Sequence, residues 1–223
     1  MSGIPTSLPV FCMPNTVLLP GADLPLLIFN PAHQQMISEV IAGSRMMVVC
    51  QTEDFLNNDP AKAKLRDVGT AGVIVTHNKL RNGGINIFIR GIDKVIIGKD
   101  VSTRPYREVE IELCGDGSIE MDELLVREQR ASIMRKLYQG SCQKVLGPFP
   151  DGSLDRLSHS TSANFVALCT RLLALSADRM YDLLEMDGLN ERIKGLSGLI
   201  NEVLLEKAVM ADCEDSDDGE YSH

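Results

Sequence analysis

Hydrophobic and polar residues alternate through much of the first half of the chain, and this period of two is typical of half-buried β-strands. The alternation is regular in residues 107–113, where Val109, Ile111 and Leu113 are separated by glutamates. The run Met46-Met47-Val48-Val49-Cys50 is apolar throughout and predicts a strand that is buried on both faces. Together these patterns predict about six strands, at residues 8–13, 17–29, 46–50, 67–80, 85–97 and 107–113.

Turn and capping residues mark the ends of these elements. Asn30-Pro31 predicts the start of one early helix, because Asn caps a helix and Pro fits its first turn. Gly43 predicts the end of that helix. Asn82-Gly83 lies between two strand patterns and predicts a hairpin turn with positive φ at both residues. Closing these strands into a small barrel would remove most of the unprotected strand edges.

The second half of the chain has the apolar period of helices. Residues 118–139 predict one helix that ends at Gly140, and a long connection rich in Gly, Pro and Ser extends from there to residue 162. Further helices are predicted to follow Ser162, Ser176 and Asp187. The last helix carries a narrow apolar seam suited to packing on a neighbour: Leu189, Ile193, Leu196, Ile200 and Val203.

The predicted fold class is therefore α+β. We expect an N-terminal pseudo-β-barrel of about six strands with one helix, followed by an all-helical C-terminal bundle. The expected boundaries are 1–116 for the β-rich barrel, 117–210 for the helical subdomain and 211–223 for a disordered acidic tail.

Charge and cysteine content narrow the class of protein. The net charge of −9 owes much to the acidic tail, and no basic stripe is present to neutralise phosphates, which argues against nucleic-acid binding. The six cysteines form no CxxC pair, so free thiols in a reducing cytoplasm are expected. No signal peptide begins the chain, and its apolar stretches are too short to span a bilayer, so we expect no membrane association.

The usual signatures of catalysis are missing from the sequence. No GxxxxGK[ST], GxGxxG, GxSxG or HExxH motif occurs, and the four histidines have no partners at metal-ligand spacing. Cys50 lies in an apolar run, which favours an inert thiol, and Cys142 has only Lys144 as a close basic neighbour. We therefore predict no catalytic residue, no metal ligand and no cofactor.

One segment of the long connection is a candidate for binding other proteins. Val145, Leu146 and Phe149 make an apolar stretch, and long loops of this kind are often functional. The alternative is that Leu146 and Phe149 fold back and pack between the two halves of the chain, because buried apolar residues are the commoner case.

Several stretches, in this order and spacing, resemble the amino-terminal domain of Lon ATP-dependent proteases. The resemblance covers residues 8–208, and it departs from the family pattern at Lys94, where Arg is usual. The stretches that carry it are Leu8-Pro9-Val10-Phe11, Val17 to Gly21, Leu24-Pro25-Leu26, Gly69-Thr70, Ile87 to Gly91, Tyr181 to Glu185 and Leu189 to Arg192.

The resemblance implies a module that recognises unfolded or tagged polypeptides, in a free-standing form without the ATPase and protease domains. We therefore expect a non-catalytic adaptor in protein quality control that holds apolar segments in a groove between the barrel and the helical half, or on the barrel's face. An ATP-dependent protease is a further expected partner. Two alternatives stay open: a small-molecule- or peptide-processing enzyme in the same fold, and an assembly partner of a separate ATPase or protease. The client and the oligomeric state are left open.

Overall fold

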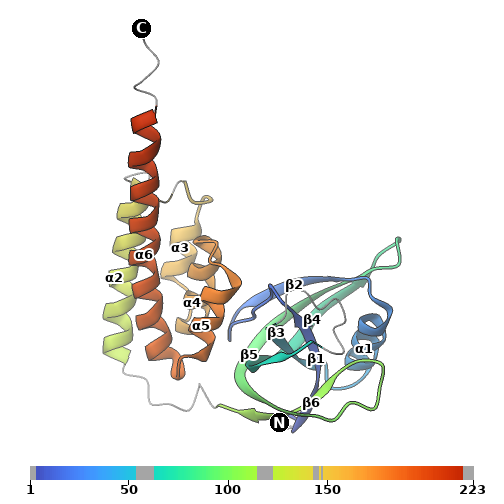
Figure 1. Cartoon of the computed structure of the whole chain (residues 1–223). Coiled ribbons are helices and arrows are strands. Elements are labelled where there is room, and N and C mark those ends of the chain that lie inside the picture. The colour runs from blue at the N-terminus through green and yellow to red at the C-terminus, as the bar shows by residue number, and fades with distance from the viewer. Residues whose placement is uncertain (1–3, 54–62, 115–122, 143–145, 147, 218–223) are drawn as a thin grey trace. The chain divides into compact units, whose positions relative to one another are not determined.

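The computed structural model describes residues 4–53, 63–114, 123–142, 146 and 148–217. The chain divides into two compact units, each of which packs mainly within itself (Figure 1). The first, called here the barrel unit, comprises Met1–Ile119 and Leu175–Glu185. The second, called the helical unit, comprises Glu120–Ala174 and Met186–His223. Each unit is described by itself.

The barrel unit is a six-stranded mixed sheet that curls into a ring (Figure 1). The strand order is β2-β5-β4-β3-β1-β6, and a further pairing of β5 with β6 closes the ring. The β1–β3 pair is parallel and the other pairs are antiparallel. The bounds are β1 Ser7–Met13, β2 Asp23–Ile28, β3 Met46–Thr52, β4 Leu65–Lys79, β5 Ile85–Asp100 and β6 Glu108–Leu113. This confirms the predicted fold class.

Strand β5 closes the ring because its two halves have different partners. Its first half pairs with β2 and its second half with β6, while β4 follows it on the other side. The register against β4 shifts where Gly91 lies opposite Gly72. A side chain at Gly91 would clash with the carbonyl of Leu19, and the Gly91 N–H donates to Ala22 O at 2.9 Å. Glycine at this bend therefore lets another segment of backbone cross the strand closely.

Strand β3 supplies both sides of the barrel's apolar core. Met47 and Val49 pack with helix α1 (Pro31–Ala42) in one cluster, and Val48 and Cys50 pack in a second cluster. The apolar run 46–50 was predicted to be buried on both faces, and this is confirmed.

The early helix and the hairpin test the predictions from turn chemistry. The Asn30 side chain accepts hydrogen bonds from Ala32 N and His33 N, as expected for the cap of α1. In the hairpin only Gly83 has positive φ, so the prediction for Asn82 was wrong. Gly83 N donates to Leu80 O, and Asn82 Oδ1 accepts from Gly84 N. This is a three-residue loop with a glycine bulge, in which one positive φ suffices.

Helix α5 (Ala177–Glu185) belongs to the barrel unit by its contacts. The Tyr181 hydroxyl accepts a hydrogen bond from Val68 N at 3.3 Å, and Arg66 pairs with Asp178 at 3.3 Å. The ammonium group of Lys94, which is buried, donates to the carbonyl of Glu185 at 3.0 Å. A cation at the last carbonyl of a helix also complements its dipole.

The helical unit contains α2 (Glu123–Cys142), α3 (Ser153–Ser158), α4 (Ser162–Leu172) and α6 (Gly188–Asp217). Helix α2 contacts α6, and α4 contacts both α3 and α6. The seam predicted on α6 is buried at Ile193, Leu196, Ile200 and Val203. No helix among the described residues is long and apolar enough to cross a bilayer.

Gly140 does not end α2, which continues to Cys142, so that prediction was wrong. A Cβ at this position would lie 2.7 Å from Leu204 Cδ2 and 2.8 Å from Leu146 Cδ1. The glycine is therefore explained by close packing within the helical unit and not by a helix terminus.

Two further differences concern segments that the sequence predicted to lack regular structure. The connection 140–162 contains the short helix α3, and α6 extends to Asp217, into the acidic segment 211–223. Residues 204–211 are mostly good helix formers, and no Gly or Pro interrupts the chain before Gly219, which permits the helix to continue past Val203. Residues 218–223 lie outside the described residues.

Candidate functional site

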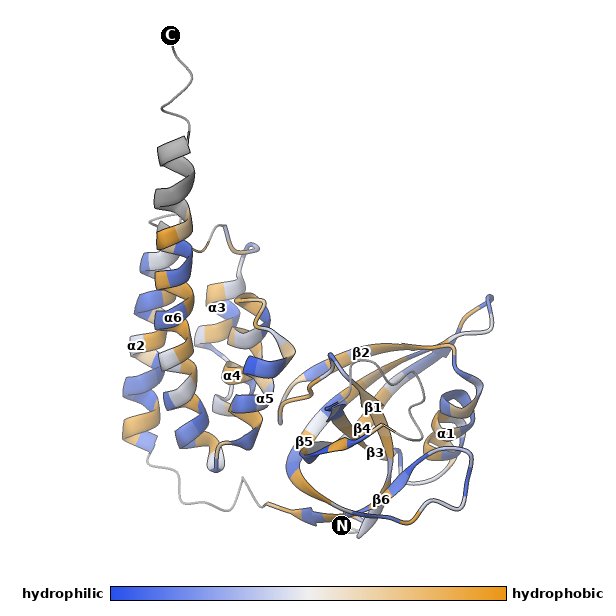
Figure 2. Ribbon diagram, viewed as in Figure 1, coloured by the Kyte–Doolittle hydropathy of each residue, from blue (hydrophilic) through white to orange (hydrophobic). Residues whose placement is uncertain are grey.

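The outer face of β2 and β5 carries apolar side chains where a half-exposed strand usually carries polar ones. In this antiparallel pair Pro25 lies opposite Phe88, and Leu27 lies opposite Asn86. The exposed fractions are 53% for Leu27, 53% for Phe29 and 41% for Phe88. We call Pro25, Leu27, Phe29 and Phe88 the apolar face, and Figure 2 shows the apolar colouring that extends along β2.

Two contacts hold the ends of the apolar face in place. At one end, Arg90 and Asp23 form a bidentate ion pair across the strands, with Nε–Oδ1 at 2.8 Å and Nη2–Oδ2 at 3.0 Å. At the other end, the Phe29 ring lies against the hairpin backbone, because a Cβ at Gly84 would come within 2.8 Å of Phe29 Cε1. The apolar residues thus lie on a regular ladder between two fixed points.

Strand β2 is at the edge of the sheet. Among the described strands only β5 pairs with it. Pro25 lies in the middle of this edge and has no N–H to donate, and prolines at such positions discourage strand addition. The face is therefore suited to contacts between side chains and not to the addition of a further strand.

The three residues predicted to bind polypeptides lie elsewhere in the chain. Val145 lies outside the described residues, Leu146 is 9% exposed and Phe149 is half-buried. Leu146 N donates to Gly140 O at 3.2 Å, and its side chain lies over Gly140 within the helical unit. Leu146 therefore folds back, as the alternative interpretation expected, but it packs within the helical unit. The binding role of the loop stays a prediction.

The apolar face was not among the predicted binding sites, although the sequence contains a signal for it. Residues 17–29 were interpreted as an apolar stretch broken by a turn or bulge at residues 20–23, and the alternation after this break was not considered. Leu24, Leu26 and Ile28 face inward or are half-buried, and the positions between them hold Asp23, Pro25 and Leu27. Phe88 occupies the corresponding outward position between Ile87 and Ile89. An apolar residue at an outward position was the signal.

The cysteines of the core are held in the protonated form. Burial raises the pKa of Cys50 to about 12, and its Sγ lies within hydrogen-bond distance of Arg66 O. Burial likewise raises the pKa of Cys169 to about 12. A nucleophilic cysteine needs a lowered pKa, so neither thiol is activated. Among the described residues, no group of three or more His, Cys, Asp or Glu is placed to hold a metal ion.

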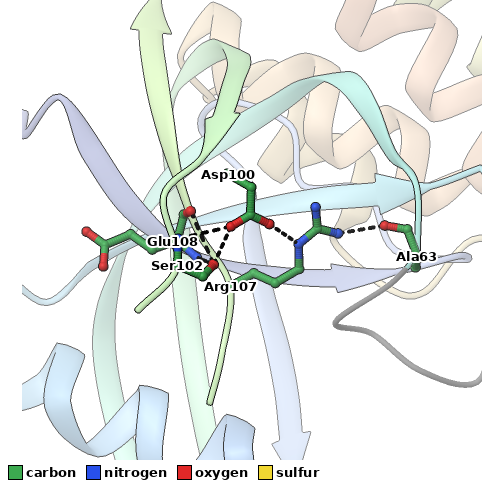
Figure 3. A network of polar contacts seen from close by, with 5 residues as sticks. All are labelled: Ala63, Asp100, Ser102, Arg107 and Glu108. Carbon is green, nitrogen blue, oxygen red and sulfur yellow. Dashed lines mark hydrogen bonds and ion pairs between the residues drawn. The ribbon is translucent and has the colours of Figure 1, made fainter. Parts of the chain in front are cut away.

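The strongest polar network of the barrel unit joins β5 to β6 (Figure 3). Arg107 Nε donates to Asp100 Oδ2 at 2.9 Å, and Arg107 Nη1 donates to Ala63 O at 2.6 Å. Ser102 donates to Asp100 from both its N–H and its hydroxyl, and the hydroxyl accepts from Glu108 N at 2.8 Å. These contacts of Asp100, Ser102 and Arg107 join protein groups to one another, which indicates a structural role for the network.

Comparison with known proteins decides the family. Residues 7–202 match the model of the ATP-dependent protease La (LON) substrate-binding domain. The chain belongs to this family. A Lon protease 2 from Bdellovibrio bacteriovorus is 25% identical over 90% of the chain and 24% of its own length. A Lon protease from Trichlorobacter lovleyi is 29% identical over 58% of the chain and 17% of its own length.

Solved structures show the same fold. The N-terminal domain of a Mycobacterium avium complex Lon protease superposes with a TM-score of 0.64 at 18% identity, covering 87% of this chain and 98% of that one. A Lon N-terminal domain protein from Xanthomonas campestris gives a TM-score of 0.58 at 20% identity, covering 86% of this chain and 96% of that one.

The match to Lon proteases is confined to the substrate-binding domain. The chain spans about a quarter of the length of the Bdellovibrio Lon protease that it matches over most of its residues. The 223 residues contain no Walker-type GxxxxGK[ST] motif, so the ATPase of those proteases has no counterpart in them. The resemblance stated from the sequence is confirmed at the level of the family.

Proposed function

We propose that this LON substrate-binding domain binds apolar segments of non-native polypeptides on the apolar face of β2 and β5. The observation that carries the proposal is the set of solvent-exposed apolar side chains on a regular ladder, with Leu27 and Phe29 each 53% exposed. Exposed apolar side chains that lie together are typical of protein contacts. An unfolded segment would bury them against its own apolar side chains, which water exclusion favours.

The proposed ligand is an unfolded polypeptide, because the face offers apolar contacts and places little requirement on the shape of the ligand. Phe88 and Leu27 offer apolar area, and the flanking Asp23 and Arg90 satisfy each other's charge. A surface of this kind accepts many apolar sequences without selecting a particular one. Pro25 discourages addition of a strand at the edge, so a bound segment can be released again.

The test is binding of the purified chain to a permanently unfolded, fluorescently labelled polypeptide, measured by anisotropy. We expect the wild type to bind with a dissociation constant on the order of micromolar, and Leu27→Asp/Phe88→Asp to bind at least about tenfold more weakly, since each lost apolar contact costs ~1–3 kcal/mol. Both side chains are exposed, so the substitutions leave the core intact. The matched control is Leu205→Asp, which changes an exposed leucine of α6.

The result that contradicts the proposal is equal binding by the wild type and the double variant, or an equal loss in Leu205→Asp. Phe149→Asp in the same assay tests the loop that contains Val145, Leu146 and Phe149 as a second binding segment. Phe149 is preferred to Leu146 for this purpose, because Leu146 is buried and its replacement by a charge would disturb the helical unit.

A separate ATP-dependent protease is the partner class that we propose for the chain as a whole. The support is the match to the substrate-binding domain of Lon proteases, which covers residues 7–202. In this role the chain would deliver a bound polypeptide to a separate ATPase or protease, and the chain itself would contribute no catalytic step.

A further inference from the structure

The helical unit contains an open cavity that the binding of unfolded polypeptides on the barrel does not use. Its volume is about 490 Å³, which lies in the range of small-ligand sites. Residues of α2 form one wall, and Ser158, Ser160 and α4 form the other. Apolar side chains from both helices line it, including Val126, Met134 and Phe165.

Arg130 is fixed at this cavity by contacts on several sides. Its Nη2 donates to Ser160 O at 2.7 Å and Leu157 O at 3.4 Å, and its Nη1 donates to Ser162 Oγ at 3.1 Å. The guanidinium also lies over the Phe165 ring, with Cζ 4.6 Å from the ring centroid. The side chain is therefore held in one orientation before any ligand arrives, which lowers the entropy cost of binding.

The charge of Arg130 is not neutralised within the described part of the chain. None of the ion pairs there involves Arg130 or its neighbour Arg127, which also lines the cavity. Its hydrogen-bond partners among the described residues are neutral oxygens. Burial lowers the pKa of Arg130, which shows that the cation is partly removed from water. A partly buried cation with neutral partners is stabilised by an anion that reaches it.

We propose that this cavity binds a peptide carboxylate, with the acid on Arg130 and Arg127 and a neighbouring apolar side chain against Met134. The three hydrogen bonds of Arg130 given above leave N–H groups that can donate single charge-assisted hydrogen bonds to a carboxylate, and Arg127 adds a second positive charge. Among the described residues the lining carries two arginines and one carboxylate, Glu123, and this net charge suits a single negative charge better than a phosphate dianion. The apolar walls would contact the rest of the ligand, and binding would displace water from the cavity.

This site stands or fails independently of the apolar face, because its residues all belong to the helical unit. Two sources of the carboxylate share this chemistry: the C-terminal end of a polypeptide, and an internal Asp or Glu next to an apolar residue. Both would let the chain recognise a short acidic-apolar signal in addition to exposed apolar segments.

The experiment measures binding of three labelled tetrapeptides to the full chain by anisotropy. One ends in leucine with a free carboxylate, the second is its C-terminal amide, and the third is an amide with glutamate before the leucine. We expect the free acid to bind at least about tenfold more tightly than the plain amide, the factor given by one charge-assisted contact. Tight binding of the third peptide would assign the site to acidic side chains as well as to chain ends.

Variants locate the binding. Arg127→Glu should weaken the binding of the free acid at least about tenfold, because it replaces an attractive charge by a repulsive one. Arg127 is exposed, so this variant folds even if Arg130→Met does not. Arg135→Glu makes the same change at an exposed arginine of α2 outside the cavity lining and should bind as the wild type does. Phe88→Asp should also bind normally.

The proposal is overturned by no binding of any peptide, by equal binding of the acid and the plain amide, or by an effect of Arg135→Glu equal to that of Arg127→Glu. A loss with Phe88→Asp but not with Arg127→Glu would place the peptide on the barrel unit, which also overturns the cavity assignment and leaves the proposed function intact.

Discussion

At the scale of single residues, the structure separates glycines by what surrounds them. Gly140 and Gly198 both lie inside helices, and the sequence gives no means to distinguish them. A Cβ at Gly140 would meet Leu204 and Leu146, whereas a Cβ at Gly198 would meet nothing within 4 Å. The sequence predicted a helix end at Gly140, because a glycine that accommodates close packing and a glycine that ends a helix have the same local pattern.

Because of this difference, the same substitution should change the free energy of unfolding in opposite directions at the two positions. Gly140→Ala should lower the free energy of unfolding by ~1–3 kcal/mol, because the added methyl overpacks the contact with Leu204 and Leu146. Gly198→Ala should raise it by ~0.5–1 kcal/mol, since alanine is the better helix former where space is open. Urea denaturation followed by circular dichroism measures both. A gain in stability at both positions would show that the packing at Gly140 is looser than described.

At the scale of elements, the alternating patterns predicted where the strands lie in the sequence. They predicted only part of the pairing between strands. The buried strand at 46–50 follows from its apolar run, the helix after Asn30 from its capping residues, and the seam on α6 from its residue period. The pairing of β5 with β2 and β6 in its two halves could not be deduced from the sequence. It depends on the bend at Gly91 and on residues far apart in the chain.

The link between β5 and β6 should make stability depend on pH. Burial acts to raise the pKa of Asp100, but hydrogen bonds from Ser102 and Arg107 outweigh it and hold the pKa below its ordinary value. A carboxyl group with a lowered pKa stabilises the folded state above its unfolded pKa of ~3.9, and this contribution is lost as pH falls through the lower folded value.

The corresponding measurement compares Asp100→Asn with the wild type over a range of pH. The wild type should be more stable at neutral pH, and the difference in free energy of unfolding should shrink as pH falls below ~4. Asp151→Asn, at an exposed aspartate outside the barrel unit, serves as the control. A difference that stays constant down to low pH would mean that the asparagine disturbs packing and that the charge of Asp100 contributes nothing.

At the scale of the whole molecule, α5 packs with strands that precede it by nearly half the chain. The sequence placed residues 177–185 in the helical subdomain, because their period is helical and their neighbours in sequence are helices. Their partners are Val68, Arg66 and Lys94, which the sequence pattern does not connect to them. The apolar face also depends on contacts between distant parts of the chain, because Pro25 and Phe88 lie side by side only when β2 and β5 pair.

Lys94 tests the attachment of α5 to the barrel. Lys94→Met keeps the apolar stem but removes the donor to Glu185 O, and a hydrogen bond from a charged group contributes ~1.5–3 kcal/mol. We expect the variant to be less stable by about this amount in urea denaturation. We also expect faster amide exchange at Val68, whose N–H bonds to Tyr181 of the same helix. Wild-type stability together with unchanged exchange at Val68 would show that Lys94 does not hold α5.

The division of the barrel unit into two stretches of sequence has a consequence for biosynthesis. Residues 120–174 and their helices emerge from the ribosome after the last strand and before α5. Because domains begin to fold as they are made, the ring of strands forms while the binding partners of Val68 and Lys94 are still untranslated. A pause in translation ahead of residue 175 would therefore hold the nascent chain with an incomplete barrel unit, and synthesis of residues 175–185 would complete it.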